Sequence, residues 1–232
     1  MKTALRMLTV VALVSALGAW AVAADGKTVE PFNGKDLSGW KTKEPASRSQ
    51  WKVGTAKLVE NHPDAIALGE GGSELVNVKR EGVDLYTEAI FGDVRIEVEV
   101  MVPKGSNSGI YVHGEYEVQV FDSYGKKELG GGDMGAIYGA SPPRVNACKA
   151  PGEWQRYVIE FRAPKFDDNG QKTANARFVK VELNGKTLHE NVEMQNVTPS
   201  GVTGKESAKG PIMFQGDHGP VAYRNLKVTP LE

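Results

Sequence analysis

The sequence predicts an all-β protein built as a jelly-roll sandwich of two antiparallel sheets. Short runs rich in Val, Ile, Tyr and Phe alternate with polar residues along most of the chain, which is the pattern of half-buried strands. Gly, Asn, Asp and Pro separate these runs, and no stretch sustains the 3.6-residue period of a helix. Many short strands joined by long loops are typical of two packed antiparallel sheets.

The clearest strand lies between Asp93 and Val102, where every second residue is Val or Ile. This period of two places one face in a core and leaves the other mostly polar. Similar patterns predict strands at Arg156–Phe161, Arg177–Leu183 and Val221–Val228.

Two hairpins are expected from turn residues. Asn184-Gly185 separates two strand-like runs, and both residue types accept the positive φ of a two-residue hairpin turn. Gly54-Thr55-Ala56 also separates two strand-like runs, Trp51–Val53 and Lys57–Val59, and predicts a second, looser hairpin. Two long connections rich in glycine, Ser123–Gly152 and Met194–Gly210, are of the length at which loops are usually functional.

The amino terminus has the pattern of a signal peptide. Lys2 and Arg6 precede an apolar run from Met7 to Val22, and the small-x-small triplet Ala21-Val22-Ala23 follows. We therefore expect residues 1–23 to be a signal peptide and residues 25–232 to be a single exported β-sandwich domain, periplasmic or extracellular. The alternative is an uncleaved anchor, but the run is short for a membrane span of about 20 residues.

Charge and cysteine content exclude several classes of protein. Loss of Lys2 and Arg6 takes the formal net charge from −1 to −3, and no basic cluster marks a nucleic-acid or membrane surface. We therefore expect no nucleic-acid partner, and no membrane partner after signal cleavage. Cys148 is the only cysteine, so an intramolecular disulfide is impossible.

The segment from Asn107 to Ser123 carries the most chemistry. Two strands are expected to meet near Gly114, with their apolar residues facing the core. The alternate residues would then project together from the open face, and they offer a base, an acid and hydrogen-bond donors. These residues are Tyr111, His113, Glu117 and Gln119. Asp122 falls off the alternation, but a β-bulge near Phe121 would turn it onto the same face.

Two rival interpretations of this segment stay open. The first is an ordinary solvated strand face. In the second, Glu117-x-Gln119-x-x-Asp122 resembles the Glu-x-Asp-x-x-Glu strand of retaining β-glucanases, whose two outer carboxylates lie roughly 5–5.5 Å apart. Here Gln replaces the middle carboxylate and the shorter Asp replaces the last one.

Further candidate substrate-binding residues lie in loops or near strand ends, and each has an ordinary structural role as its alternative. Tyr138 would stack on a sugar or pin its loop, and Arg224 would form an ion pair by default. The remaining candidates are Lys149, Gln215 and His218. The four histidines show no zinc-type spacing, and Asp167-Asp168-Asn169-Gly170 is better interpreted as a turn than as a calcium loop.

Short motifs in a fixed order resemble one family along nearly the whole chain after the signal peptide. They are Phe32–Trp40, Asn107–Tyr111, Tyr116–Val120, Gly135–Gly139, Pro151–Trp154, Leu183–Gly185, Gly210–Gly219 and Tyr223–Leu226. In this order they resemble the secreted bacterial 3-keto-disaccharide hydrolases, also described as 3-keto-glucoside 1,2-lyase/3-keto-2-hydroxyglucal hydratase domains. His113 stands where an arginine is also frequent in that family.

The resemblance implies a concanavalin A-like jelly roll that cleaves 3-keto-glycosides, including 3-keto-disaccharides. The C3 ketone acidifies the C2 proton, so a base removes it and the C1 substituent leaves by elimination, after which water adds. The base would be His113 or Glu117. Contacts to the enolate and the hydroxyls would come from Gln119, Lys149, Gln215, His218 and Arg224. No cofactor is certain, although a divalent metal on the enolate oxygen is an open possibility. The fold also serves non-catalytic carbohydrate-binding modules, which is the other class kept open.

Overall fold

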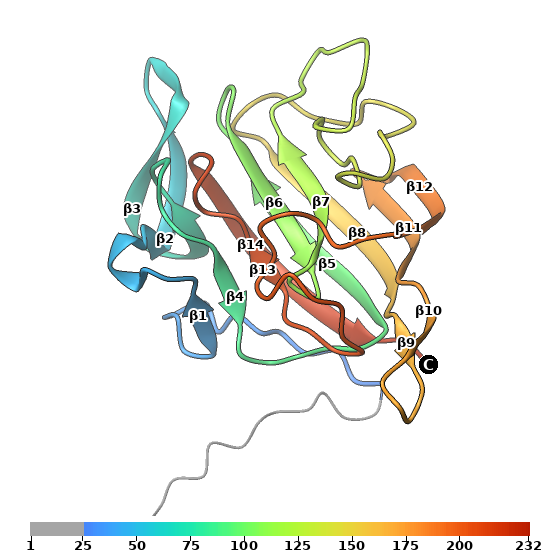
Figure 1. Ribbon diagram of the computed structural model, residues 1–232. Coiled ribbons are helices and arrows are strands. Elements are labelled where there is room, and N and C mark those ends of the chain that lie inside the picture. Colours follow the sequence, from blue (N-terminus) through green and yellow to red (C-terminus); the bar gives the residue numbers. More distant parts are fainter. Residues whose placement is uncertain (1–25) are drawn as a thin grey trace, which may run out of the picture.

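The computed structural model describes residues 26–232, which form fourteen strands and one turn of 3-10 helix (Figure 1). In chain order these are β1 (Trp40–Thr42), η1 (Ala46–Arg48), β2 (Trp51–Val59), β3 (His62–Asn77), β4 (Leu85–Thr87), β5 (Val94–Met101), β6 (Asn107–Val112), β7 (Tyr116–Phe121), β8 (Trp154–Arg162), β9 (Lys165–Phe166), β10 (Lys172–Ala174), β11 (Arg177–Leu183), β12 (Lys186–Glu193), β13 (Met213–Phe214) and β14 (Val221–Pro230). The predicted signal peptide lies outside these residues. Within them no helix is long and apolar enough to cross a membrane.

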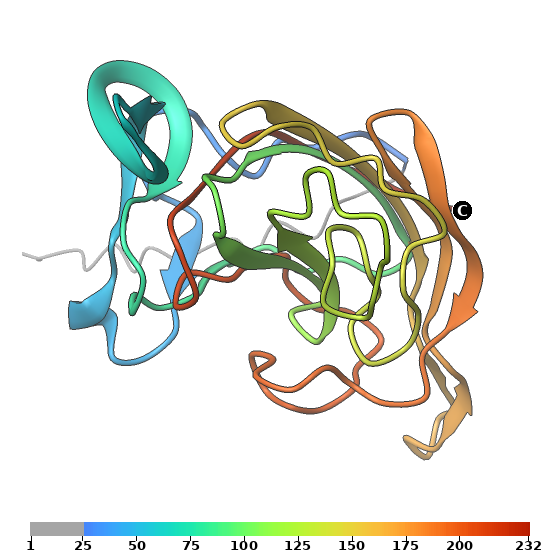
Figure 2. The same cartoon turned by 90° about the horizontal axis from the view of Figure 1, so that it is seen from above.

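The strands form two large antiparallel sheets. The smaller sheet has the order β1-β4-β13-β6-β7, and the larger has the order β12-β11-β8-β5-β14-β3-β2. Figure 2 shows the larger sheet curving round the smaller one. The predicted all-β sandwich is confirmed, as are the strands expected at residues 93–102, 156–161, 177–183 and 221–228.

The hairpin between β11 and β12 is confirmed, but the one expected at residues 54–56 is wrong. Asn184 and Gly185 have φ values of 52° and 77°, and Leu183 pairs with Lys186 across them. Strand β2 instead continues through Gly54, and the chain turns at Asn61, whose φ is 62°. Near Gly54 the pairing with β3 shifts register, so the glycine accommodates an irregularity in the ladder and not a turn.

An aromatic column ties the two sheets together in the core. Phe214 of β13 stacks on Tyr223 of β14 at a centroid separation of 3.9 Å and on Trp40 of β1 at 5.5 Å. The Tyr223 hydroxyl lies 2.8 Å from the hydroxyl of Ser108 on β6. Strands β6 and β13 of the smaller sheet are thus fixed against β14 of the larger sheet, and β1 is fixed to β13 through Phe214.

The two long connections cover the other face of the smaller sheet. The carbonyl of Gly132, between β7 and β8, accepts a hydrogen bond from the Gln119 side chain. The carbonyl of Pro199, between β12 and β13, lies 3.2 Å from the Tyr111 hydroxyl. We call this face, opposite the core, the loop-covered face.

Removal of the Phe214 ring should destabilise the protein severely. The ring is fully buried between two aromatic partners, so Phe214→Ala leaves a cavity and costs about 3–5 kcal/mol of unfolding free energy. Urea denaturation would measure the change. Tyr124→Ala is the control, because that ring is 60% exposed and its loss should change stability by only about 0.5 kcal/mol. Equal losses for both variants would contradict the role assigned to the column.

Candidate functional site

Strands β6 and β7 place three polar side chains on the loop-covered face. Ile110 and Val118 belong to the core, so Tyr111, Glu117 and Gln119 point the other way. The expected shared face is therefore observed for these three residues. It is not open, however, because Glu117 and Gln119 are each only 4% exposed beneath the loops.

The carboxylate of Glu117 is fitted into a space left by glycine. The Tyr111 hydroxyl lies 3.1 Å from Glu117 Oε2, as expected for residues paired directly across β6 and β7. A Cβ at Gly109, the neighbouring position on β6, would overlap the Glu117 carboxylate. The Glu117 backbone N–H donates to the Thr198 hydroxyl at 3.1 Å, which fixes the loop above it.

Burial makes Glu117 a basic carboxylate. Desolvation, with smaller contributions from the charges of Asp84 and Asp217, raises the pKa of Glu117 to about 7. The Tyr111 hydrogen bond opposes this rise. The pKa of Tyr111 is itself raised by burial and by the Glu117 charge, so the phenol remains a hydrogen-bond donor at neutral pH. A carboxylate with this pKa is suited to accept and return a proton near neutral pH.

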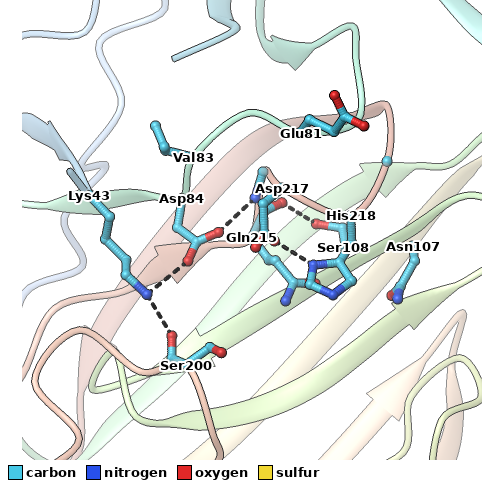
Figure 3. Close-up of polar contacts among 12 residues, drawn as sticks. Lys43, Glu81, Val83, Asp84, Asn107, Ser108, Ser200, Gln215, Asp217 and His218 are labelled. Carbon is cyan, nitrogen blue, oxygen red and sulfur yellow. Dashed lines mark hydrogen bonds and ion pairs between the residues drawn. The ribbon is translucent and has the colours of Figure 1, made fainter. Parts of the chain in front are cut away.

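A partly buried ion pair lies beside these residues. Asp84 precedes β4 and is 5% exposed, and its Oδ2 lies 3.2 Å from Nζ of Lys43. The Gly216 N–H donates to Asp84 Oδ1 at 3.0 Å (Figure 3). Desolvation raises the pKa of Asp84, whereas the Gly216 bond and Lys43 lower it.

Asp217 and His218 occupy the turn between β13 and β14. The His218 Nδ1 forms a short contact with Asp217 Oδ1, and the two side chains lie on the same side of the turn in Figure 3. Their side chains are 41% and 49% exposed, so they lie at the solvent edge of the site. A histidine paired with a carboxylate can deliver a proton to a bound ligand.

Three buried side-chain amides have oxygen atoms without a hydrogen-bond partner within residues 26–232, and two of them belong to candidate site residues. These two are Oε1 of Gln119 and Oε1 of Gln215. The Gln119 orientation is fixed, because its Nε2 donates to the Gly132 carbonyl at 3.2 Å and to Asn107 Oδ1 at 3.1 Å. Unsatisfied buried acceptors cost free energy, so these oxygens are suited to accept hydrogen bonds from ligand hydroxyls.

Tyr138 lies at the outer edge of β7. Its backbone N–H donates to the Glu117 carbonyl at 3.1 Å, while the adjacent Ile137 is buried in the core. The alternation leaves Tyr138 on the side of Glu117, and the residue is 42% exposed. This placement allows a ring to stack on it.

The expected placement of His113 on this face is wrong. His113 begins the turn between β6 and β7 with a φ of 56°, so it leaves the strand alternation. Its ring packs against Phe161 in the core at a centroid distance of 5.0 Å, and its Nε2 lies 2.9 Å from the Gly92 carbonyl. Burial lowers the pKa of His113 and favours its neutral form.

Asp122 does not join Glu117 either. Strands β6 and β7 pair without a register shift, beginning with Asn107 opposite Phe121. The expected bulge near Phe121 is therefore absent from this pairing. The Asp122 carboxylate instead accepts hydrogen bonds from the backbone N–H groups of Gly105 and Tyr124, at 2.9 and 3.2 Å. It stabilises the loop ends beyond the strand.

The structure also places Arg224 and Lys149 away from the group around Glu117. Arg224 pairs with Glu99 of β5 at 2.6 Å and lies 4.0 Å above the Trp154 ring, on the larger sheet. Lys149 donates to the Trp154 carbonyl at 3.0 Å. Both long side chains have partners at the larger sheet, so the structure does not bring them beside Glu117 as expected.

Lys43 and Asp84 were missed by the sequence prediction. The one available signal is the alternation that begins at the buried Trp40, which assigns Lys43 to the face away from the core. Nothing in the sequence indicates that Asp84 lies beside it. As for a metal, residues 26–232 contain no group of three His, Cys, Asp or Glu side chains arranged to hold one.

Comparisons with known proteins agree with this architecture. The model of a family described as a 3-keto-alpha-glucoside-1,2-lyase-like domain matches residues 27–229. A solved structure of a candidate glycosyl hydrolase from Parabacteroides distasonis is 27% identical, with a TM-score of 0.67 over 88% of this chain and 84% of that one. A second candidate glycosyl hydrolase from that organism is 20% identical, with a TM-score of 0.59 over 89% and 94% of the two chains, and shows the shared fold. No curated protein matches this chain.

Glu117→Gln should stabilise the protein above neutral pH. Between the ordinary carboxyl pKa near 4.5 and about 7, the folded state keeps a proton that the unfolded state loses, so stability falls as pH rises through this range. The neutral amide avoids that cost, and we expect a gain of about 1–3 kcal/mol at pH 8 and little gain at pH 4. Denaturant unfolding at both pH values would measure it. Glu190→Gln, at a carboxylate 54% exposed, should give no such pH-dependent gain. A Glu117→Gln gain that is equal at both pH values would contradict the raised pKa.

Proposed function

The chain belongs to the 3-keto-alpha-glucoside-1,2-lyase-like domain family, and from this premise we propose that it cleaves 3-keto-glycosides by elimination. Membership of this family supports a carbohydrate-active function in general. The finer proposal is that a C3 ketone on the sugar allows the C2 proton to be removed and the C1 substituent to leave. The observation that carries it is the buried Glu117 carboxylate, whose pKa of about 7 suits it to accept a proton from carbon.

The proposed reaction proceeds through an enolate. Ionised Glu117 takes the C2 proton, and the C–H electron pair delocalises onto the C3 carbonyl oxygen. When the enolate collapses, the C1–O bond breaks, its electron pair leaves with the aglycone oxygen, and a C1–C2 double bond remains. The aglycone oxygen receives a proton from an acid. Water can then add its hydroxyl to C1 and a proton to C2, which makes the overall result a hydrolysis.

Residues around Glu117 have chemistry suited to the remaining steps. Protonated His218, paired with Asp217 at the solvent edge, is the proposed acid for the aglycone oxygen. The Gln119 oxygen would accept a hydrogen bond from a sugar hydroxyl, and the Gln215 side chain would donate one to the enolate oxygen. Tyr138 would stack on a ring at the edge of β7.

We also propose that the protein acts after export. The charged start, apolar run and Ala21-Val22-Ala23 triplet support this, and the substrate would then be an oxidised mono- or disaccharide glycoside in the periplasm or outside the cell. Cell fractionation of the full-length protein would test it.

Purified protein should release the aglycone from a 3-keto-glucoside but not from the unoxidised parent glycoside. NMR in D2O should show deuterium at C2 of the released keto-sugar, because solvent supplies the proton that replaces the one taken by the base. Parallel reactions with EDTA would reveal any metal requirement. Cleavage of the parent would instead support a conventional glycosidase, and saturable glycan binding without turnover would support a binding module.

Glu117→Gln should lower kcat at least a hundredfold on the 3-keto-glucoside, because the amide cannot accept the C2 proton. In the wild type, the acidic limb of the kcat/KM profile should rise with pH up to about 7 as Glu117 becomes ionised. Glu190→Gln, on the larger sheet, should retain wild-type kinetics. A near-wild-type rate in Glu117→Gln, or a wild-type pH profile in that variant, would rule out Glu117 as the base.

A further inference from the structure

The Lys43–Asp84 ion pair connects both segments that border Glu117. Lys43 Nζ donates to the Ser200 carbonyl at 2.8 Å and contacts the Gly201 carbonyl at 3.3 Å, which ties it to the loop before β13. Asp84 accepts the Gly216 N–H, which ties it to the turn carrying Asp217 and His218. Figure 3 shows the pair between these two segments, with Ser200 on one side and Asp217 on the other.

Neighbouring carbonyls link this pair to Glu117. The Tyr111 hydroxyl lies within hydrogen-bond distance of both Glu117 Oε2 and the Pro199 carbonyl, at 3.1 and 3.2 Å. Ser200, whose carbonyl is held by Lys43, is the next residue, with a φ of 66°. A non-glycine residue with positive φ is costly and persists only where its surroundings hold it. The Lys43 ammonium supplies such a constraint, because it binds the carbonyls of Ser200 and Gly201.

The charge of Asp84 also reaches Glu117. The groups acting on the Glu117 carboxylate are Tyr111 from β6, Asp84 from the start of β4 and Asp217 from the β13–β14 turn. Both aspartates favour its protonated form. Asp84 is almost fully buried, whereas the Asp217 side chain is 41% exposed, so water screens the charge of Asp84 less than that of Asp217.

We propose that Lys43 and Asp84 are positioning residues, which hold the Ser200 loop and the Asp217–His218 turn in place around Glu117. The pair acts through its neighbours and is not assigned a contact with substrate. Asp84 loses its hydration on burial, and an ion pair at such a position is seldom a net gain in stability, which favours a role in fixing the site. This inference rests on the proposed function for its kinetic consequence only, because its effect on Glu117 is measurable without substrate.

The test compares Asp84→Asn and Lys43→Met with matched variants of the Lys172–Glu206 pair. That pair also anchors the loop before β13, with an Nζ to Oε2 distance of 2.7 Å, but it connects the loop to β10. Glu206→Gln and Lys172→Met therefore remove equivalent charges from a second ion pair that holds the same loop. NMR of protein labelled with carbon-13 glutamate would follow the titration of Glu117, whose resonance is the one missing in Glu117→Gln. Hydrogen exchange would follow the loop amides.

In Asp84→Asn, removal of the negative charge should lower the pKa of Glu117 below its wild-type value of about 7, and kcat on the 3-keto-glucoside should fall about tenfold. In Lys43→Met, the Val202 and Thr203 amides should exchange at least tenfold faster, and Lys43→Arg should restore most of their protection. The Lys172→Met and Glu206→Gln variants should leave the Glu117 titration unchanged.

An unchanged Glu117 pKa in Asp84→Asn, or faster exchange of equal size in Lys43→Met and Lys172→Met, would overturn the proposal. If Asp84→Asn does not fold, the exchange comparison of the lysine variants decides it alone. Absence of turnover in the wild type would overturn the proposed function and leave the NMR and exchange results to decide this inference. If the wild type turns over normally and the Glu117 pKa is unchanged in Asp84→Asn, this inference is rejected and the proposed function stands.

Discussion

The burial of one carboxylate, Glu117, is the constraint on which the rest of the site depends. An ionised carboxylate removed from water is unstable unless its surroundings compensate, and here they do so only in part. Tyr111 donates one hydrogen bond, while two nearby aspartates oppose ionisation. Gly109 is required because any side chain there would occupy the carboxylate's space. The resulting proton affinity is a property of the whole arrangement of strands and loops.

Such a site must be rigid, and the core beneath it provides the rigidity. The Tyr157 hydroxyl on β8 donates to the Gln119 carbonyl at 2.7 Å, and Ser108 contacts Tyr223 of β14 from below. Above the sheet, the Thr198 hydroxyl and the carbonyls of residues 199–201 hold the covering loop down. Side chains placed on strands and supported from both faces have little freedom to depart from their geometry.

Sequence patterns could predict what is local and could not predict what the sheet order brings together. A period of two was enough to place Tyr111, Glu117 and Gln119 on one face. It failed at His113, because a positive φ in a tight turn ends the alternation at that residue. Lys43 and Asp84 meet because β1 pairs with β4, and Asp84 meets Gly216 because β4 pairs with β13. Nothing in the local sequence specifies those pairings.

The electrostatics of the site bear on which carbohydrate chemistry it suits. A retaining glycosidase needs one ionised nucleophile and one protonated acid about 5–5.5 Å apart. Here Asp122 is bound by backbone N–H groups at the strand end, and Asp84 is held by Lys43 and Gly216. Of these three carboxylates, Glu117 is the one whose pKa burial raises to about 7. A carboxylate with a raised pKa is a stronger base, which matters when the proton comes from carbon. Elimination from a 3-keto-sugar requires such a base and no carboxylate nucleophile, so it makes better use of this arrangement than a displacement at C1 would.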